Sequence, residues 1–356
     1  MALSSSLRDE RREPFAHIGR MTEPAPLSDT DIEATALALA PYIRETPVWS
    51  WWDEELTRRL DPDTRIVLKL ELFQHAGSFK ARGALAVMLG LEPAVRARGV
   101  TAVSAGNHAI AVSWAAQTLG TSAKVVMPRT ADPLRVARCR ALGAEAVLAE
   151  DVHAAFALAQ QIEREEGRTF VHPFEGPRTA LGTATLGREL LRQEPALDAI
   201  VVPIGGGGLA GGLSTAVKQT KPSCLVFGVE PEANDVMLRS IRSGHPEQVP
   251  EGAPRTIADS LSPPYTLPYS LGLCRRYLDD VVLVSDDAMR EALALLFRGA
   301  KLAVEPAGAA ATAALLGPLR ERLQGKQVGL IICGTNIAPE RYAEHLARGS
   351  ALLKWT

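Results

Sequence analysis

A single lysine has surroundings that favour nucleophilic chemistry. Lys80 lies in the segment His75-Ala-Gly-Ser-Phe-Lys-Ala-Arg-Gly83, where a loop is predicted to turn into a helix, and its near neighbours are small or apolar up to Arg82. Burial and the positive end of a helix both favour the uncharged amine, which is a nucleophile. Because most lysines are solvated surface residues, other segments must decide whether Lys80 is reactive.

Four consecutive glycines, Gly205, Gly206, Gly207 and Gly208, form a second candidate site. They follow the apolar run at 199–203 and precede a predicted helix at 209–218. Glycines let the backbone turn tightly and direct several N–H groups at one point, and the following helix adds its positive end. A turn that is merely flexible would not need to lie between a strand and a helix. The loop is therefore predicted to bind a phosphate group.

The third segment, Ser104-Ala-Gly-Asn-His108, also joins a predicted strand to a predicted helix. Free N–H groups at such a junction can hold a carboxylate, and the Asn107 amide can bond a ring hydroxyl. Ser104 or Asn107 can also simply cap the helix, which is compatible with ligand binding. Two anion sites and a lysine nucleophile together indicate a phosphate-bearing cofactor beside an amino-acid carboxylate.

The glycines also support a different class of enzyme. Gly206, Gly208 and Gly211 have the G-x-G-x-x-G spacing of dinucleotide-binding turns, and Glu230 closes the next predicted strand, where a ribose-binding acid is expected. An NAD-dependent oxidoreductase is therefore an alternative. It is the weaker one, because a nicotinamide site does not need Lys80.

The elements that position these segments alternate between short apolar runs and helical patterns. Such alternation indicates an α/β fold with parallel sheets covered by helices on both faces, and ligands in these sheets bind at the carboxyl ends of the strands. The predicted strands span 65–72, 100–104, 124–128, 146–148, 199–203, 225–229 and 328–332. The predicted helices span 79–91, 107–119, 134–142, 153–165, 183–191, 209–218, 287–299 and 307–316. A Pro-rich loop at 261–269 is expected to lie over the active site.

Composition excludes several classes of partner. The 356 residues carry 39 basic and 41 acidic side chains, for a net charge of -2, which does not favour a nucleic-acid or membrane-surface partner. Residues 199–217 lack charge, but Pro203 and six glycines make a membrane helix a poor interpretation. Four separated cysteines and the absence of a visible secretory signal suggest a cytoplasmic protein with reduced thiols.

Seven segments together resemble the fold type II pyridoxal-phosphate enzymes, most closely their threonine/serine dehydratase group. The matching segments occur in the family's order between about Thr46 and Asn336. They are Ser78-Phe-Lys80-Ala-Arg-Gly-Ala, Ser104-Ala-Gly-Asn-His108, Gly205-Gly-Gly-Gly208-Leu, Gly228-Val-Glu-Pro, Thr256-Ile-Ala-Asp, Glu305-Pro-Ala-Gly-Ala and Cys333-Gly-Thr-Asn336. The resemblance implies two open, mainly parallel twisted sheets covered by helices, as in the tryptophan synthase β chain, with a smaller domain inserted in a larger one. We expect a disordered leader at 1–21, a large cofactor-binding domain at 22–92 and 174–350, and a small domain at 93–173.

The resemblance also implies roles for individual residues. Lys80 is expected to form a Schiff base with pyridoxal 5'-phosphate, with Phe79 beside the ring and Asn107 on its 3-hydroxyl. Cys333 is expected to face the ring nitrogen as a neutral and weak hydrogen-bond partner. The phosphate is expected on Gly205, Gly206, Gly207, Gly208 and Leu209. The substrate carboxylate is expected on Ser104, Ala105, Gly106, Asn107 and His108.

The expected reaction is the dehydration and deamination of a β-hydroxy amino acid, such as L-threonine or L-serine, to a 2-oxo acid and ammonia. Ala105 stands where serine racemases carry a second serine as the opposite-face base, so racemisation is the lesser alternative. The 261–269 loop is richer in Pro and Tyr than expected for simple threonine deaminases, and if it faces the β-substituent the substrate is expected to be bulkier or differently charged than threonine. Val236 falls where a second carboxylate near Glu230 would be needed, so no metal is assigned. A homodimer is expected, and a non-catalytic amino-acid binder remains a further alternative.

Overall fold

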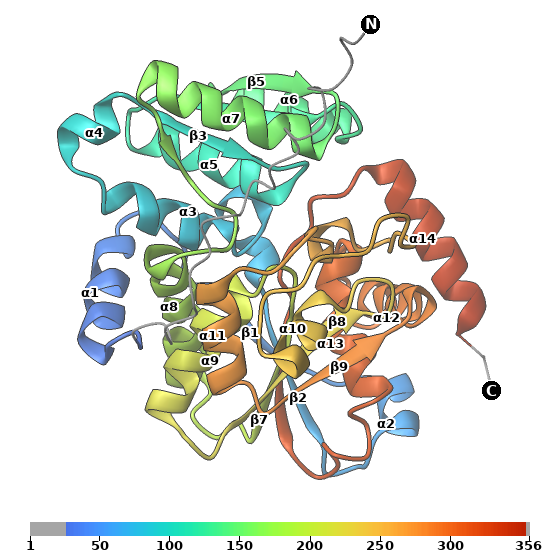
Figure 1. Ribbon diagram of the computed structural model, residues 1–356. Helices are drawn as coiled ribbons and strands as arrows, with labels where there is room; N and C mark the ends of the chain where they lie inside the picture. Colours follow the sequence, from blue (N-terminus) through green and yellow to red (C-terminus); the bar gives the residue numbers. More distant parts are fainter. Residues whose placement is uncertain (1–25, 354–356) are drawn as a thin grey trace, which may run out of the picture.

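The computed structural model describes residues 26–353, and the leader predicted at 1–21 lies outside these described residues. The described chain is an α/β structure with two mainly parallel sheets flanked by helices, which confirms the predicted fold class (Figure 1). Among these residues, no helix has the length and apolar character that crossing a lipid bilayer requires.

The larger sheet has six strands in the order β1-β2-β10-β7-β8-β9. All neighbouring pairs are parallel except β1 with β2. The central strand β7 (Ala199–Pro203) is buried along its whole length, as expected for an apolar strand in a parallel sheet with helices on both faces. The other strands are β1 (Val48–Trp51), β2 (Arg65–Lys69), β8 (Leu225–Pro231), β9 (Asp280–Val284) and β10 (Gln327–Ile331).

The smaller sheet has four parallel strands in the order β5-β4-β3-β6. All its strands come from the middle of the sequence, and in Figure 1 it lies above the larger sheet. They are β3 (Val100–Val103), β4 (Ala123–Pro128), β5 (Glu145–Ala149) and β6 (Thr169–Phe170).

Helices cover both sheets. In Figure 1, α8 and α9 lie to the left of the larger sheet and α12 lies to its right. Helix α13 packs closely because it consists almost entirely of buried small residues. The helices are α1 (Asp29–Leu39), α2 (Glu54–Arg59), α3 (Lys80–Leu89), α4 (Pro93–Ala97), α5 (Asn107–Thr118), α6 (Pro133–Ala141), α7 (Val152–Glu166), α8 (Pro177–Gln193), α9 (Gly208–Thr220), α10 (Val236–Ser243), α11 (Pro268–Tyr277), α12 (Asp286–Arg298), α13 (Pro306–Leu316) and α14 (Pro339–Leu352).

Proline explains two differences from the predicted elements. Helix α8 begins at Pro177 rather than at 183, and helix α11 begins at Pro268, inside the segment predicted as a loop. Proline suits the first helical position, because its ring fixes φ and its missing N–H would have no intrahelical partner there. Three short 3-10 turns, Glu71–Phe73, His75–Gly77 and Asp259–Leu261, complete the described elements that lead into the site.

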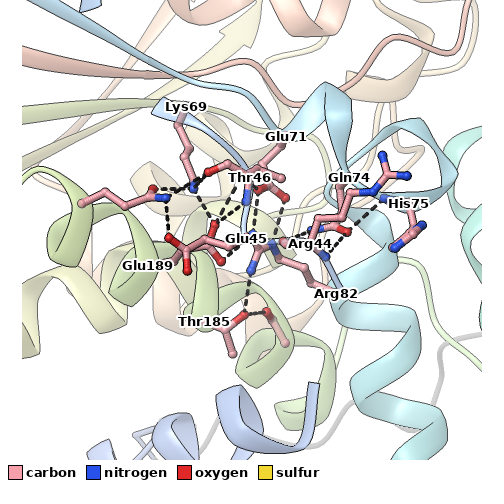
Figure 2. Close-up of polar contacts among 12 residues, drawn as sticks. Arg44, Glu45, Thr46, Lys69, Glu71, Gln74, His75, Arg82, Thr185 and Glu189 are labelled. Atoms are coloured by element: carbon pink, nitrogen blue, oxygen red, sulfur yellow. Dashed lines mark hydrogen bonds and ion pairs between the residues drawn. The ribbon is translucent and has the colours of Figure 1, made fainter. Parts of the chain in front are cut away.

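A buried network of charges fixes the start of α3 against β2 and α8 (Figure 2). Arg82 donates to both oxygens of Glu71, at 2.9 and 2.8 Å, and also contacts Glu189 at 2.9 Å. Lys69 contacts the other oxygen of Glu189 at 2.5 Å. Lys69, Glu71 and Arg82 are fully buried. Two cations therefore face two anions, and this pairing is what makes their burial tolerable.

Candidate active site

A pocket of about 200 Å³ lies where loops at the carboxyl ends of strands from both sheets meet. It contains Lys80, the whole Ser104–His108 segment and part of the predicted Pro-rich loop, so three segments far apart in the sequence converge there. This confirms the placement of the loop beside the candidate site. The lining residues are Lys80, Val103, Ser104, Ala105, Gly106, Asn107, His108, Pro128, Arg135, Val152, Phe156, Pro173, Phe174, Gly206, Asp259, Ser260, Ser262, Pro263, Pro264 and Tyr265.

Lys80 is the first residue of α3, and its side chain enters the pocket. Its Nζ donates to the Pro173 carbonyl at 2.5 Å. Burial lowers the pKa of Lys80 to about 8, against the opposing attraction of Cys333 and Glu305. A substantial fraction of the amine is therefore uncharged near pH 8, which is the condition for nucleophilic attack on a carbonyl carbon.

Asn107 is the first residue of α5, and its amide is held from two sides. Its Oδ1 accepts from Asn336 Nδ2 at 2.7 Å, and its Nδ2 donates to Glu305 Oε1 at 2.5 Å. One N–H of the amide therefore remains for a ligand or for Ser260, whose Oγ lies 3.3 Å away. Neither Asn107 nor Ser104 caps α5; the cap residue is Gly106, whose N–H donates to Ser104 Oγ at 3.0 Å.

His108 also lines the pocket, although its ring is bound to the protein. Its Nε2 lies 2.8 Å from the Val171 carbonyl, so Nε2 carries the hydrogen. Burial, followed by the nearby charge of Lys80, lowers the pKa of His108 to about 3. The imidazole is therefore neutral at ordinary pH and is not a cationic partner for a carboxylate.

The glycine loop begins directly after β7 and ends in the first turn of α9. Gly207 adopts the left-handed conformation, with φ of 88°, that glycine accommodates without strain. The first N–H groups of α9 have no partner within the helix and form the positive end of its dipole. Gly208 and Leu209 line a small cavity together with Phe79 and Lys80. The loop thus fits a phosphate group attached to a ring that reaches Lys80.

Replacing Gly208 by alanine tests this cradle. A methyl group there would lie 2.5 Å from the Phe174 carbonyl oxygen, closer than real carbon atoms approach, so the loop must move. We expect at least about tenfold weaker cofactor binding, measured by titrating the cofactor-free protein and following visible absorbance. Gly143→Ala is the control for a glycine replacement outside the loop: its added methyl meets no neighbour, its φ of 82° adds local backbone strain, and circular dichroism checks that both variants fold before titration. Equal cofactor affinities in the two variants would contradict a phosphate cradle at Gly208.

Cys333 follows β10 and is buried. Burial raises the pKa of its thiol well above the usual value, so Cys333 stays neutral. Its carbonyl accepts from the Phe79 N–H at 3.1 Å, which ties the start of α3 to the end of β10. A neutral thiol at this point matches the weak hydrogen-bond partner predicted for a ring nitrogen.

The structure adds residues to the site that the sequence did not single out. Phe156 on α7 and Tyr265 on the loop face each other with ring centroids 6.1 Å apart, and the Phe174 ring lies 6.3 Å from that of Tyr265. The guanidinium of Arg135 on α6 also lines the pocket. Tyr265 stood in the 261–269 segment noted for its Pro and Tyr content, whereas nothing in a regular amphipathic helix distinguishes Phe156.

Glu230 does not have the role that a dinucleotide enzyme would give it. Its two carboxylate oxygens accept from the Met237 and Leu238 N–H groups, both at 2.8 Å, at the start of α10. Burial raises its pKa to about 8. The carboxyl group is thus occupied in starting α10. Within residues 26–353 no cluster of three or more His, Cys, Asp or Glu side chains is arranged to hold a metal ion.

A buried lysine with a depressed pKa, a glycine turn at a helix start, a fixed amide and a neutral thiol are the groups expected in an enzyme that holds a phosphate-bearing carbonyl cofactor through an amine. Residues 39–334 match the family described as "Pyridoxal-phosphate dependent enzyme", and the chain belongs to this family. Its cofactor is pyridoxal 5'-phosphate, and the NAD-dependent alternative is excluded.

Named relatives narrow the class further. The chain is 55% identical to a phenylserine dehydratase of Ralstonia pickettii over 87% of its own length and 94% of that protein. It is 40% identical to an L-threonine ammonia-lyase of Thermotoga maritima, over 76% of its length and 67% of that protein. Among solved structures, maize serine racemase superimposes with a TM-score of 0.83 at 29% identity, covering 91% and 99% of the two chains. The fold, the site and these relatives identify a pyridoxal-phosphate-dependent lyase of the dehydratase type.

Proposed function

We propose that this enzyme removes water and ammonia from a β-hydroxy amino acid whose β-carbon carries an aromatic ring, with phenylserine as the simplest example. The observation that carries the proposal is the aromatic wall of the pocket, formed by Phe156, Phe174 and Tyr265 and extended by Pro263 and Pro264. Aromatic rings favour edge-to-face or offset contact with another ring. The dehydratase relative named for phenylserine supports the same substrate class.

The charges in the pocket support this class over a substrate with a second carboxylate. Arg135 contacts Asp259 at 2.7 Å, and its Nε and Nη2 donate to the Asn336 carbonyl at 3.0 and 2.6 Å. A guanidinium with these partners has little capacity left for a substrate anion. The proposed β-substituent is therefore apolar.

The proposed roles follow from the placement of the side chains. Bound pyridoxal phosphate supplies an aldehyde that takes up the amino group of the substrate and a ring that withdraws electrons from Cα. Backbone N–H groups of Ser104–Asn107 bind the substrate carboxylate, and the remaining N–H of Asn107 orients the ring hydroxyl. Lys80, once free, takes the proton from Cα. Cys333 leaves the ring nitrogen unprotonated, which favours prompt loss of the β-hydroxyl. Ala105 offers no base for proton exchange, which supports elimination over racemisation.

An ammonia-release assay on the cofactor-loaded enzyme tests the proposed substrate class. The compared substrates are L-threo-phenylserine, L-threonine and L-serine, each also assayed for its 2-oxo acid. We expect kcat/KM for phenylserine to exceed that for threonine by at least about tenfold, as an apolar pocket discriminates by added contact area. A preference for serine or threonine would overturn the aromatic assignment, and absence of ammonia from all three would overturn dehydration itself.

Phe156→Ala tests the aromatic wall directly. Loss of the ring should lower kcat/KM for phenylserine about 10- to 100-fold and that for threonine by a much smaller factor, because only the aryl group loses a contact. Phe170→Ala is the matched control: its ring lies 6.3 Å from that of Phe156 but does not line the pocket. This variant should change kcat/KM for phenylserine and for threonine by the same factor. Parallel losses in Phe156→Ala would show that Phe156 only supports the fold.

We also propose the two-domain division at 22–92 and 174–350 and at 93–173, which the two separate sheets support. A cytoplasmic location is consistent with the four buried free cysteines, since reducing conditions keep thiols unpaired. A homodimer is proposed from the resemblance to the family alone.

A further inference from the structure

Loss of a hydroxyl group needs a proton, because hydroxide is a poor leaving group. Ser104, Ser260 and Ser262 each bring a hydroxyl to the pocket. Ser104 Oγ accepts from the Gly106 N–H at 3.0 Å, and Ser262 donates weakly to the Ala258 carbonyl at 3.4 Å. Of these three, Ser260 is the one whose hydroxyl contacts carboxyl groups.

Ser260 is the pocket hydroxyl that contacts the buried carboxyl group of Glu305, which Asn107 and Arg135 of the pocket also contact. Its Oγ lies 3.1 Å from Glu305 Oε2 and 3.3 Å from Asp259 Oδ1. Glu305 is only 1% exposed and does not line the pocket, whereas Ser260 is half-buried and does. The other Glu305 oxygen accepts from Asn107 Nδ2 at 2.5 Å. Any proton that passes between Glu305 and a ligand in the pocket has Ser260 as its nearest carrier.

We propose that Ser260 and Glu305 form a proton relay that protonates the leaving β-hydroxyl of the substrate. Lys80 takes the proton from Cα, the Cβ–O bond breaks, and its electron pair leaves with the oxygen. Ser260 gives its hydroxyl proton to that oxygen, and Glu305 gives its carboxyl proton to Ser260, so that water departs and Glu305 remains as a carboxylate. The proton on Lys80 returns to Glu305 through solvent after each turnover. The proposal rests on the dehydration proposed above.

The surroundings of Glu305 favour the protonated form that the relay needs. Burial raises its pKa to about 7; Asp259 adds to the increase, and Arg135, Asn107 and Ser260 oppose it. Arg135 Nη2 also donates to Oε2, at 3.4 Å, which is longer than the contacts that Asn107 and Ser260 make with this carboxyl group. The other titratable groups that face Glu305 are Lys80 and Cys333, both coupled to it electrostatically. Below about pH 7 the Glu305 carboxyl group keeps its proton. Above that pH a growing fraction of Glu305 is ionised and has no proton to pass to Ser260.

A substrate with a different leaving group distinguishes a proton-relay role of Ser260 from a structural one. L-Serine and β-chloro-L-alanine give the same products apart from the leaving group, and chloride departs without a proton. We expect Ser260→Ala to lower kcat for serine and for phenylserine about 100-fold, a typical contribution of a general acid. The kcat for β-chloro-L-alanine should stay within about threefold, because its departure does not use the relay. Equal losses on the hydroxy and chloro substrates would overturn the relay.

Further variants and readouts keep the test independent of folding. Ser262→Ala removes a hydroxyl two positions along in the same pocket and should change kcat for the hydroxy and the chloro substrates by the same factor.

Glu305→Gln should reproduce the leaving-group selectivity of Ser260→Ala and abolish the fall in kcat above about pH 7. Without substrate, its infrared spectrum should lack a protonated-carboxyl band that the unmodified enzyme shows below that pH. Absence of that band from the unmodified enzyme would overturn the proposal. Failure of the unmodified enzyme to release ammonia from hydroxy substrates would instead contradict the proposed function.

Discussion

Lys80→Ala is expected to lower ammonia release by at least about 10³-fold, since the variant loses both the amine that holds the cofactor and the base at Cα. Borohydride should no longer attach pyridoxal phosphate to the protein, which peptide mass analysis detects. Lys80→Arg is the matched control: it keeps a positive charge at the start of α3 but offers no nucleophilic amine. It should be equally inactive. Retained borohydride labelling in either variant would place the reactive amine elsewhere.

The pH dependence of cofactor uptake gives a second measurement on the same residue. Burial lowers the pKa of Lys80 from 10.5 to about 8, and only the unprotonated amine attacks an aldehyde. Uptake of pyridoxal phosphate by the cofactor-free protein should therefore quicken about tenfold per pH unit below pH 8 and level off above it. A midpoint near 10.5, the value of a solvated lysine, would contradict the buried position of the amine.

Arg82→Met is expected to lower the free energy of unfolding by about 3–5 kcal/mol, the usual cost of removing one member of a buried ion pair. The substitution leaves the buried Glu71 and the partly buried Glu189 with Lys69 as their sole remaining cation in the described network (Figure 2). Urea unfolding of the cofactor-loaded enzyme, followed by circular dichroism, measures the change.

The control for Arg82→Met is an ion pair with the same charges on the surface. Arg348 contacts Glu344 at 2.9 Å on α14, and both side chains are more than half exposed. Exposed pairs contribute at most about 1 kcal/mol, so Arg348→Met should have little effect. Adding Glu71→Leu to Arg82→Met should restore part of the loss, because it removes an unpaired buried anion. Equal effects of Arg82→Met and Arg348→Met would show that the buried network contributes little to stability.

The sequence predicted the central strands and most of the helices that start at the site, because apolar runs and helical patterns are local signals. It missed β1, which has only one buried residue and runs antiparallel at the edge of the sheet. It also missed α14, which is largely exposed. In both elements the apolar periodicity was too weak to distinguish a regular structure from a loop.

Within the site, Lys80, Asn107, Gly206 and Cys333 were identified from strand-end position and resemblance to the family. Their orienting partners lie in segments that carry the resemblance, but no role was predicted for these partners. Glu305 and Asn336, which fix the Asn107 amide, lie 198 and 229 residues away in sequence. Contacts over such separations leave no local pattern. Glu230 was identified from its position at a strand end, but the role considered for it was wrong. In sequence, an acidic residue that binds a ribose looks the same as one that accepts from the first N–H groups of a helix. Only the position of α10 distinguishes the two.

Most of the wall that faces the β-substituent comes from different segments than the groups proposed to hold the cofactor. Phe156 lies on α7 and Pro263–Tyr265 on a surface loop, whereas Lys80, the glycine turn and Cys333 follow strands of the larger sheet. Evolution or a designer can therefore vary which β-substituent is accepted through four positions without changing Lys80, the glycine turn or Cys333. A combinatorial library at 156 and 263–265 is a compact route from this scaffold to deaminases with altered substrate range.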